Sequence, residues 1–166
     1  MSSAEIRTRI QIPNVGNDLG ILYDTYDKWK LLYISSDNFF NAPSKGFEST
    51  SYPEQEGENI DARTVDAPFD YTVVFLVCCE NSGIENANKY IAEFNKALYT
   101  QSGDIKTYKT ITFYNDYKKV KIVGVPTPLS EAKEYWRDNT GMQYDAVKVE
   151  LKIRVTKPSL CDFNLK

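Results

Sequence analysis

The sequence contains no histidine among its 166 residues. Histidine is the most frequent general base and metal ligand in proteins, and it activates the nucleophile in Ser-His and Cys-His pairs. A phosphate-binding loop is also missing, because Gly16, Gly20 and Gly46 fit neither the dinucleotide-binding nor the Walker spacing. The sequence therefore predicts a protein that is not an enzyme and that uses no cofactor and no metal.

Cysteine is scarce, and its positions argue against a disulfide framework. Cys78 and Cys79 are adjacent, so in a strand their side chains face opposite sides of a sheet, while Cys161 stands alone near the end. Burial in an apolar strand disfavours the reactive thiolate, and we interpret the adjacent pair as structural residues. The thiols fit a chain that is made in a reducing cytoplasm.

Long apolar runs and basic clusters are missing as well. The longest largely apolar run, Tyr71 to Cys79, is far shorter than the roughly 20 residues that span a bilayer, and Met1 to Glu5 lacks the features of a signal peptide. The formal net charge is −3, with both signs interspersed, so no basic stripe can neutralise nucleic-acid phosphates. We expect no membrane insertion and no specific binding of nucleic acid.

Acidic residues leave two chemical alternatives open. The stretches Asp18 to Asp27 and Asp61 to Asp70 are rich in oxygen ligands for a hard cation, but they lack the spacing and ligand density of an EF-hand. A hydrolase that works without histidine would need paired carboxylates. Such pairs occur at Glu54/Glu56 and Glu131/Glu134. A solvated surface is the favoured interpretation of all these residues.

The two tryptophans, Trp29 and Trp136, stand beside charged residues and suggest a second class of function. An exposed indole can stack on a sugar or contact a protein partner, whereas a buried one packs against a sheet. Packing is the favoured role for at least one of them. A carbohydrate- or small-ligand-binding module therefore remains the alternative function.

What the sequence does contain is a high number of aromatic residues, twelve Tyr and eight Phe, which suit half-buried strands. Alternating apolar and polar residues predict strands with one buried face, and a run that is apolar on both faces predicts a central strand. The predicted strands are Glu5 to Ile12, Phe69 to Cys79, Ala146 to Thr156, and a hairpin of Lys106 to Phe113 with Lys118 to Val125. Leu19 to Tyr26 is predicted to be extended, and Thr127 to Thr140 to be a loop.

One segment has helical rather than strand periodicity. Apolar residues recur at helical spacing from Ile84 to Tyr99, and Ser82 precedes them as an N-cap. The predicted fold is therefore α+β and β-rich, a mainly antiparallel β-sandwich or split barrel with one packed amphipathic helix. A single domain is expected to span residues 1–166.

The segment from Ser35 to Asp66 differs in composition from the rest of the chain. It is rich in Ser, Asn, Pro, Gly and Glu, yet Gly46 to Tyr52 alternates as an extended strand does. Loops beyond about 12–15 residues in compact domains are usually functional. We interpret the segment as a long extended arm that contacts a neighbouring subunit. The candidate contact residues are Lys45, Phe47, Tyr52 and Asp61.

The order of these features, from Tyr23 to Val155, resembles the N-terminal domain of phage distal tail proteins. The residues that carry the resemblance are Asp24 to Tyr33, Pro43-Ser44-Lys45, Gly57 to Asp61, the helical segment Ile84 to Tyr99 and the strand Lys118 to Gly124. The related tail-tube and tail-terminator proteins share this architecture and remain open as alternatives. The resemblance implies a β-sandwich-like module that works as a virion structural protein of a phage or prophage.

The resemblance also implies the partners. It suggests a homo-oligomeric ring, a hexamer, that joins tail-tube proteins to tail-tip proteins in a virion tail assembled in the host bacterial cytoplasm. DNA would be only passing cargo in the lumen of that ring. The negative net charge agrees with this role, because a chain with few clustered cations does not grip the phosphate backbone.

Overall fold

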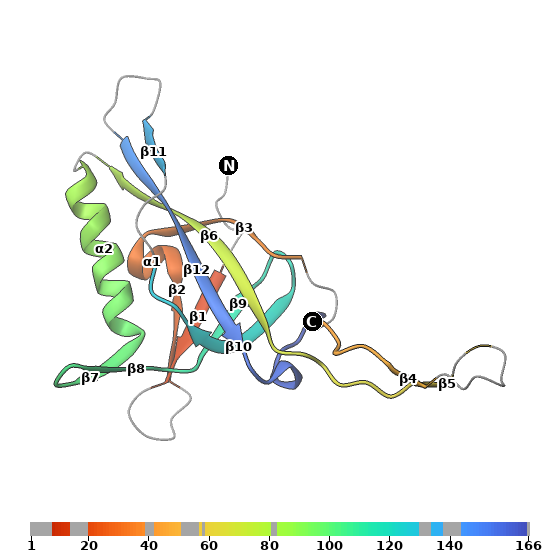
Figure 1. The fold of residues 1–166 in the computed structure, drawn as a ribbon. Coiled ribbons are helices and arrows are strands. Elements are labelled where there is room, and N and C mark those ends of the chain that lie inside the picture. The colour runs from red at the N-terminus through yellow and green to blue at the C-terminus, as the bar shows by residue number, and fades with distance from the viewer. Residues whose placement is uncertain are drawn as a thin grey trace.

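The protein is described here from a computed structural model (Figure 1). It describes residues 8–13, 20–38, 42–50, 57, 59–80, 83–129, 134–137 and 144–165. Within these ranges the chain is strand-rich, and every strand pairing is antiparallel. The predicted α+β, β-rich class is confirmed.

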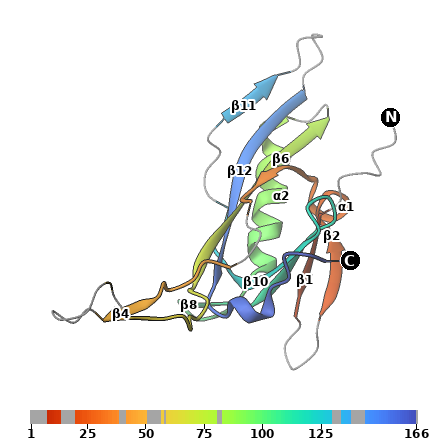
Figure 2. The same cartoon turned by 90° about the vertical axis from the view of Figure 1, so that its right-hand side faces the viewer.

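The body is built on an eight-stranded sheet that does not close into a barrel. Its strands run in the order β2-β1-β9-β10-β12-β6-β3, and β11 pairs with β12. The bounds are β1 (Thr8–Ile12), β2 (Ile21–Asp24), β3 (Leu31–Ser36), β6 (Phe69–Glu80), β9 (Ile111–Asn115), β10 (Val120–Pro126), β11 (Glu134–Arg137) and β12 (Tyr144–Val155). Figure 2 shows β6 and β12 on one side of the body and β1 and β2 on the other, as in a sandwich.

Where the residues are described, pairing and burial confirm the three long strand predictions; Glu5 to Arg7, the predicted start of the first strand, lie outside the described residues. β1 and β12 bury alternate residues, because a strand points successive side chains to opposite faces of the sheet. β6 lies between β12 and β3 and buries Tyr71, Val73, Phe75 and Val77 completely. The side chains on its other face, Thr72, Val74 and Leu76, are only half-buried. The strand therefore has a neighbour on each edge, but only one of its two faces packs in the core.

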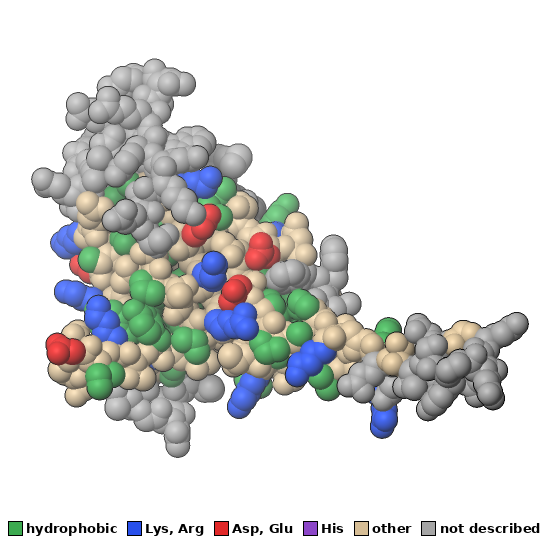
Figure 3. Space-filling view, in the orientation of Figure 1, with side chains coloured by type: hydrophobic (Ala, Val, Ile, Leu, Met, Phe, Trp, Pro, Cys, Tyr) green, Lys and Arg blue, Asp and Glu red, His purple; other side chains and the backbone are tan. Residues whose placement is uncertain are grey.

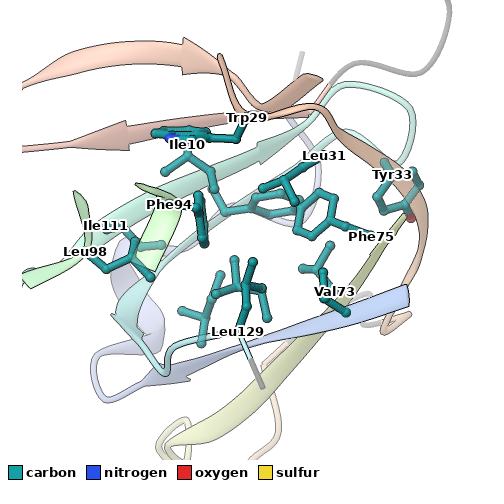
Figure 4. Packing of buried hydrophobic residues seen from close by; sticks show 14 of the residues in the cluster. Ile10, Trp29, Leu31, Tyr33, Val73, Phe75, Phe94, Leu98, Ile111 and Leu129 are labelled. Atoms are coloured by element: carbon teal, nitrogen blue, oxygen red, sulfur yellow. The ribbon is translucent and has the colours of Figure 1, made fainter. Parts of the chain in front are cut away.

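The predicted amphipathic helix is α2 (Gly83–Ala97), and it packs on the inner face of β6 and β12. Ala87, Phe94 and Leu98 from its apolar stripe are fully buried. The proposed N-cap Ser82 lies outside the described residues. Figure 4 shows Phe94 pointing toward Trp29, with the two rings 4.9 Å apart in an edge-to-face arrangement.

A second, short helix was not predicted. The end of the segment expected to be extended, Leu19 to Tyr26, turns into α1 (Thr25–Trp29). Asp24 caps this helix by accepting hydrogen bonds from the backbone N–H groups of Tyr26 and Asp27, and Lys30 ends it in a left-handed conformation at φ 57°. One helical turn is too short to produce a periodic sequence pattern, and local capping decides its conformation.

The hairpin prediction was correct for its second strand and wrong for the extent of its first. Lys106 to Phe113 splits into β8 (Ile105–Tyr108), which pairs with β7 (Tyr99–Ser102), and β9, which pairs with β10. The strands separate because the N–H of Lys109 donates to the carbonyl of Leu98 at the end of α2. The loop predicted at Thr127 to Thr140 is also wrong in part, because β11 lies within it.

Two further features close the fold. A 3-10 turn, η1 (Pro158–Leu160), follows β12, and Lys121 then exchanges backbone hydrogen bonds with Asp162. Gly124 lies where β10 meets β12, and a Cβ there would overlap the backbone carbonyl of Arg154. The close approach of β10 to β12 therefore requires a residue without a side chain at this position.

Candidate intersubunit arm

Residues 42–50 and 59–67 form the two sides of a hairpin that leaves the body between β3 and β6 and stands clear of it in all three overall views (Figures 1, 2 and 3). At its base Ser44 bridges to Asp66. The N–H of Lys45 donates to the carbonyl of Val65 at 3.0 Å, and the N–H of Ala67 donates to the carbonyl of Pro43 at 2.6 Å. The predicted long extended arm is therefore present as an antiparallel ladder, but it does not begin at Ser35 as predicted, because Ser35 and Ser36 belong to β3.

The outer part of the arm is a two-stranded sheet, β4 (Glu48–Thr50) with β5 (Asn59–Asp61). The register changes by one residue between the Ser44 bridge and the Glu48–Asp61 pair, which is the signature of a β-bulge. The extra residue is on the returning strand, between Asp61 and Asp66, and Gly46 lies on the strand opposite it at φ +87°, where a Cβ would meet no other atom within 4 Å. Glycine is thus required at this position for its backbone conformation rather than for space.

The root of the arm is held to β6 by a network around Ser36 and Asp37. Asp37 exchanges two hydrogen bonds with the backbone of Thr72, at 2.9 and 3.1 Å. The Ser36 hydroxyl contacts the hydroxyl of Tyr33 at 2.8 Å and accepts from that of Tyr71 at 3.0 Å. These contacts fix the direction in which the chain leaves the body.

Burial raises the pKa of the Tyr71 phenol to about 12, although its hydrogen bond to Ser36 opposes the shift. The neutral phenol is therefore favoured in the folded state. Its contribution to stability is complete below about pH 10, where an unfolded tyrosine begins to ionise, and is lost as the pH rises toward 12.

Replacing Tyr71 with Phe is expected to reduce this alkaline loss of stability. At pH 7 the variant should lose about 0.5–1.5 kcal/mol, the usual net contribution of one hydrogen bond. Between pH 10 and 12 its stability should fall less steeply than that of the parent, as measured by urea unfolding at each pH. The exposed Tyr117→Phe is the matched control and should follow the parent. Identical slopes for Tyr71→Phe and the parent would show that the phenol is not perturbed by burial.

The four candidate contact residues all lie in the arm. Two of them, Lys45 and Phe47, have exposed side chains in the structure. Lys45 is exposed beside the base ladder, and Phe47 is 61% exposed before β4. Asp61 pairs with Glu48 through the backbone, but its side chain is outside the described residues, as is the whole of Tyr52. Sequence reasoning missed Val65, which is 60% exposed. Val65 could have been found in the sequence as an apolar residue between polar neighbours, Thr64 and Asp66.

The arm is a two-stranded element that projects from the body. A two-stranded hairpin is at best marginally stable in water. Within the described residues, β4 and β5 pair only with each other, so both outer edges carry unpaired backbone N–H and C=O groups. Unpaired strand edges on a projecting segment can add to the sheet of a neighbour.

No protein-family model and no curated protein matches this sequence. The structure, however, superposes on the crystal structure of SPP1 Dit (gp 19.1), with a TM-score of 0.54 over 91% of this chain. The two proteins share a fold. Their sequences are 10% identical, and the chain spans 50% of the length of Dit. SPP1 Dit is described as a paradigm of the hub adsorption apparatus in phages that infect Gram-positive bacteria.

The described tryptophan and cysteine side chains of this Dit-like fold, those of Trp29 and Cys161, are buried or half-buried. Trp29 is 2% exposed, which confirms the packing role and removes it as a sugar platform, while the side chain of Trp136 is outside the described residues. Cys161 is half-buried, accepts a hydrogen bond from the N–H of Val123, and has a pKa raised by burial. β6 contains Cys78 and Cys79, but their side chains are outside the described residues.

No group of three or more His, Cys, Asp or Glu side chains in the described residues is arranged to hold a metal ion. No described helix is long and apolar enough to cross a membrane.

Proposed function

We propose that this protein is a structural component of a phage or prophage tail, a ring-forming distal tail protein that connects the tail tube to the tail tip. The observation that carries the proposal is the fold shared with SPP1 Dit over 91% of the chain. The projecting arm with its two free strand edges supports it, because it supplies a means of joining copies.

In this role the partners are other copies of the same chain in a hexameric ring, together with tail-tube and tail-tip proteins. The arm contacts the neighbouring copy through residues that include Lys45, Phe47, Tyr52 and Asp61. DNA passes through the lumen without being gripped, because the chain has a net charge of −3 and no basic run along its sequence. The protein performs no catalysis in this role.

The alternative function, a carbohydrate- or small-ligand-binding module, loses one of the two residues that suggested it. Trp29 packs between Tyr23 and Phe94, with ring centroids 5.3 and 4.9 Å away, and has no free face for a sugar. The ring-forming tail role is therefore the better-supported function.

The test is genetic and microscopic. A stop codon early in the gene, in the phage or prophage that carries it, should abolish infectious particles and intact tails in electron micrographs. Expression of the chain from a plasmid should restore them, and gold-labelled antibody should mark the tip of the restored tails. Normal tails in the stop-codon mutant, or label along the whole tube, would contradict the distal tail role.

A further inference from the structure

On the side of the body away from the arm, a cavity of about 440 Å³ opens between α1, the end of α2 and the ends of β1 and β2. Its apolar wall includes Ile12, Tyr23 and Trp29. Ligand pockets commonly have volumes of about 300–1,000 Å³, with a few polar groups at the rim of an apolar wall. The cavity is thus of a size to receive side chains of a partner.

The rim of this cavity is strongly basic for a chain with net charge −3. Lys28, Lys96 and Lys109 line it together with one carboxylate, Glu93, so the four residues carry a net charge of +2. Lys28 lies 5.5 Å from the centre of the Tyr23 ring. No ion pair found among the described residues involves any of these lysines. The cavity therefore suits a ligand that combines carboxylates with an apolar group.

The arm has this chemistry. Between Ala42 and Ala67 it holds six acidic residues and two basic ones, a net charge of −4. The acidic residues are Glu48, Glu54, Glu56, Glu58, Asp61 and Asp66, and the basic ones are Lys45 and Arg63. Phe47 adds an exposed aromatic ring. Charge complementarity of this kind steers association and selects the partner.

We infer that the acidic arm of one copy docks into the lysine-rimmed cavity of the next copy, an inference that rests on the proposed ring-forming role. The arm cannot fill the cavity of its own chain, because the two lie on opposite sides of the body (Figures 1 and 2). A contact between two different surfaces is head-to-tail, and head-to-tail contacts generate a ring when the rotation closes.

The reach of the arm is sufficient for this contact. An extended strand rises about 3.3 Å per residue, so the stretch from Pro43 to Thr50 spans roughly 25 Å. A compact domain of this length has a radius of gyration of about 15 Å. The arm therefore extends beyond its own body far enough to enter a neighbour.

Charge reversal on each side provides the test, with sedimentation velocity of the full-length chain as the measurement. Variant one is Lys96→Glu with Lys109→Glu, and variant two is Glu48→Lys, Glu58→Lys and Asp61→Lys, which changes the net charge of the arm from −4 to +2. Glu48 and Asp61 form a pair across the hairpin, so reversing both keeps a like-charged pair within the arm. Each variant alone should form oligomers at least tenfold more weakly than the parent.

An equimolar mixture of the two variants should restore oligomers. In the mixture the acidic arm of variant one meets the basic cavity of variant two, and the basic arm of variant two meets the acidic cavity of variant one. Raising the salt concentration should weaken the parent and the mixture alike. A control with the same change in charge elsewhere, Lys89→Glu with Lys152→Glu, should assemble like the parent. Circular dichroism of every variant checks that the domain is folded.

Three results would overturn the inference. The first is a cavity variant that assembles like the parent, the second is a mixture that fails to recover, and the third is a parent that stays monomeric. The tail role is judged separately, by the stop-codon phenotype and the labelled tails. If deleting Lys45 to Gly57 from the arm abolishes assembly but the cavity variant does not, the arm docks elsewhere and the ring-forming proposal stands.

Discussion

Replacing Phe94 with Asp is expected to abolish cooperative unfolding of the domain. Phe94 is fully buried where α2 meets the sheet, and its ring contacts Trp29 edge to face. Truncating a buried Phe costs about 3–5 kcal/mol. The new carboxylate would in addition lie in an apolar site without a partner, which costs several kcal/mol more. Since the free energy of unfolding of a domain is only about 5–15 kcal/mol, the two costs together are comparable with the whole stability of the domain.

Urea and thermal unfolding followed by circular dichroism measure this effect. Ala92→Asp is the matched control, because Ala92 lies on the exposed face of the same helix. It reports the cost of aspartate in the helix without the cost of burial, and its unfolding should stay cooperative. A Phe94→Asp protein that unfolds like Ala92→Asp would show that the apolar stripe of α2 faces solvent.

Deleting Lys45 to Gly57 is expected to leave the body folded and to eliminate ring formation. The deletion removes β4 and leaves β5 without its strand partner, and within the described residues both strands pair only within the arm. It retains the hydrogen bond from Ala67 to Pro43 and the contacts of Asp37 with β6 that anchor the root. Circular dichroism should resemble that of the parent, while sedimentation and electron micrographs should show no rings or stacks.

A full-length control separates the arm's chemistry from its length. Phe47→Ser with Val65→Ser keeps the hairpin but removes its exposed apolar groups, and it should weaken assembly without abolishing it. If the deletion variant assembles as well as the parent, the arm is not the subunit contact. The ring contacts must then come from the open edges of the sheet, β2 and β3.

The long periodic segments were predictable because side chains alternate every two residues in a strand and repeat every 3.6 residues in a helix. Alternation in β1 and β12 and the helical spacing in α2 each identify a single element with one buried face, and the structure buries those faces. The short elements α1, β7 and β11 were missed. They contain too few residues to show a period, and local capping or pairing with a neighbour decides them.

By itself the sequence determined that the chain contains no histidine, that it forms a β-rich domain with one long helix, and that an acidic, extended arm interrupts it. Only the tertiary structure decided that this arm is a bulged hairpin with free edges and that the root is held by Ser36 and Asp37. Only the tertiary structure also showed that a cavity lies on the side of the body opposite the arm. Lys28, Lys96 and Lys109 come from separate elements, and no spacing along the chain brings them together; packing of α1 against α2 and the bond from Lys109 to Leu98 do so.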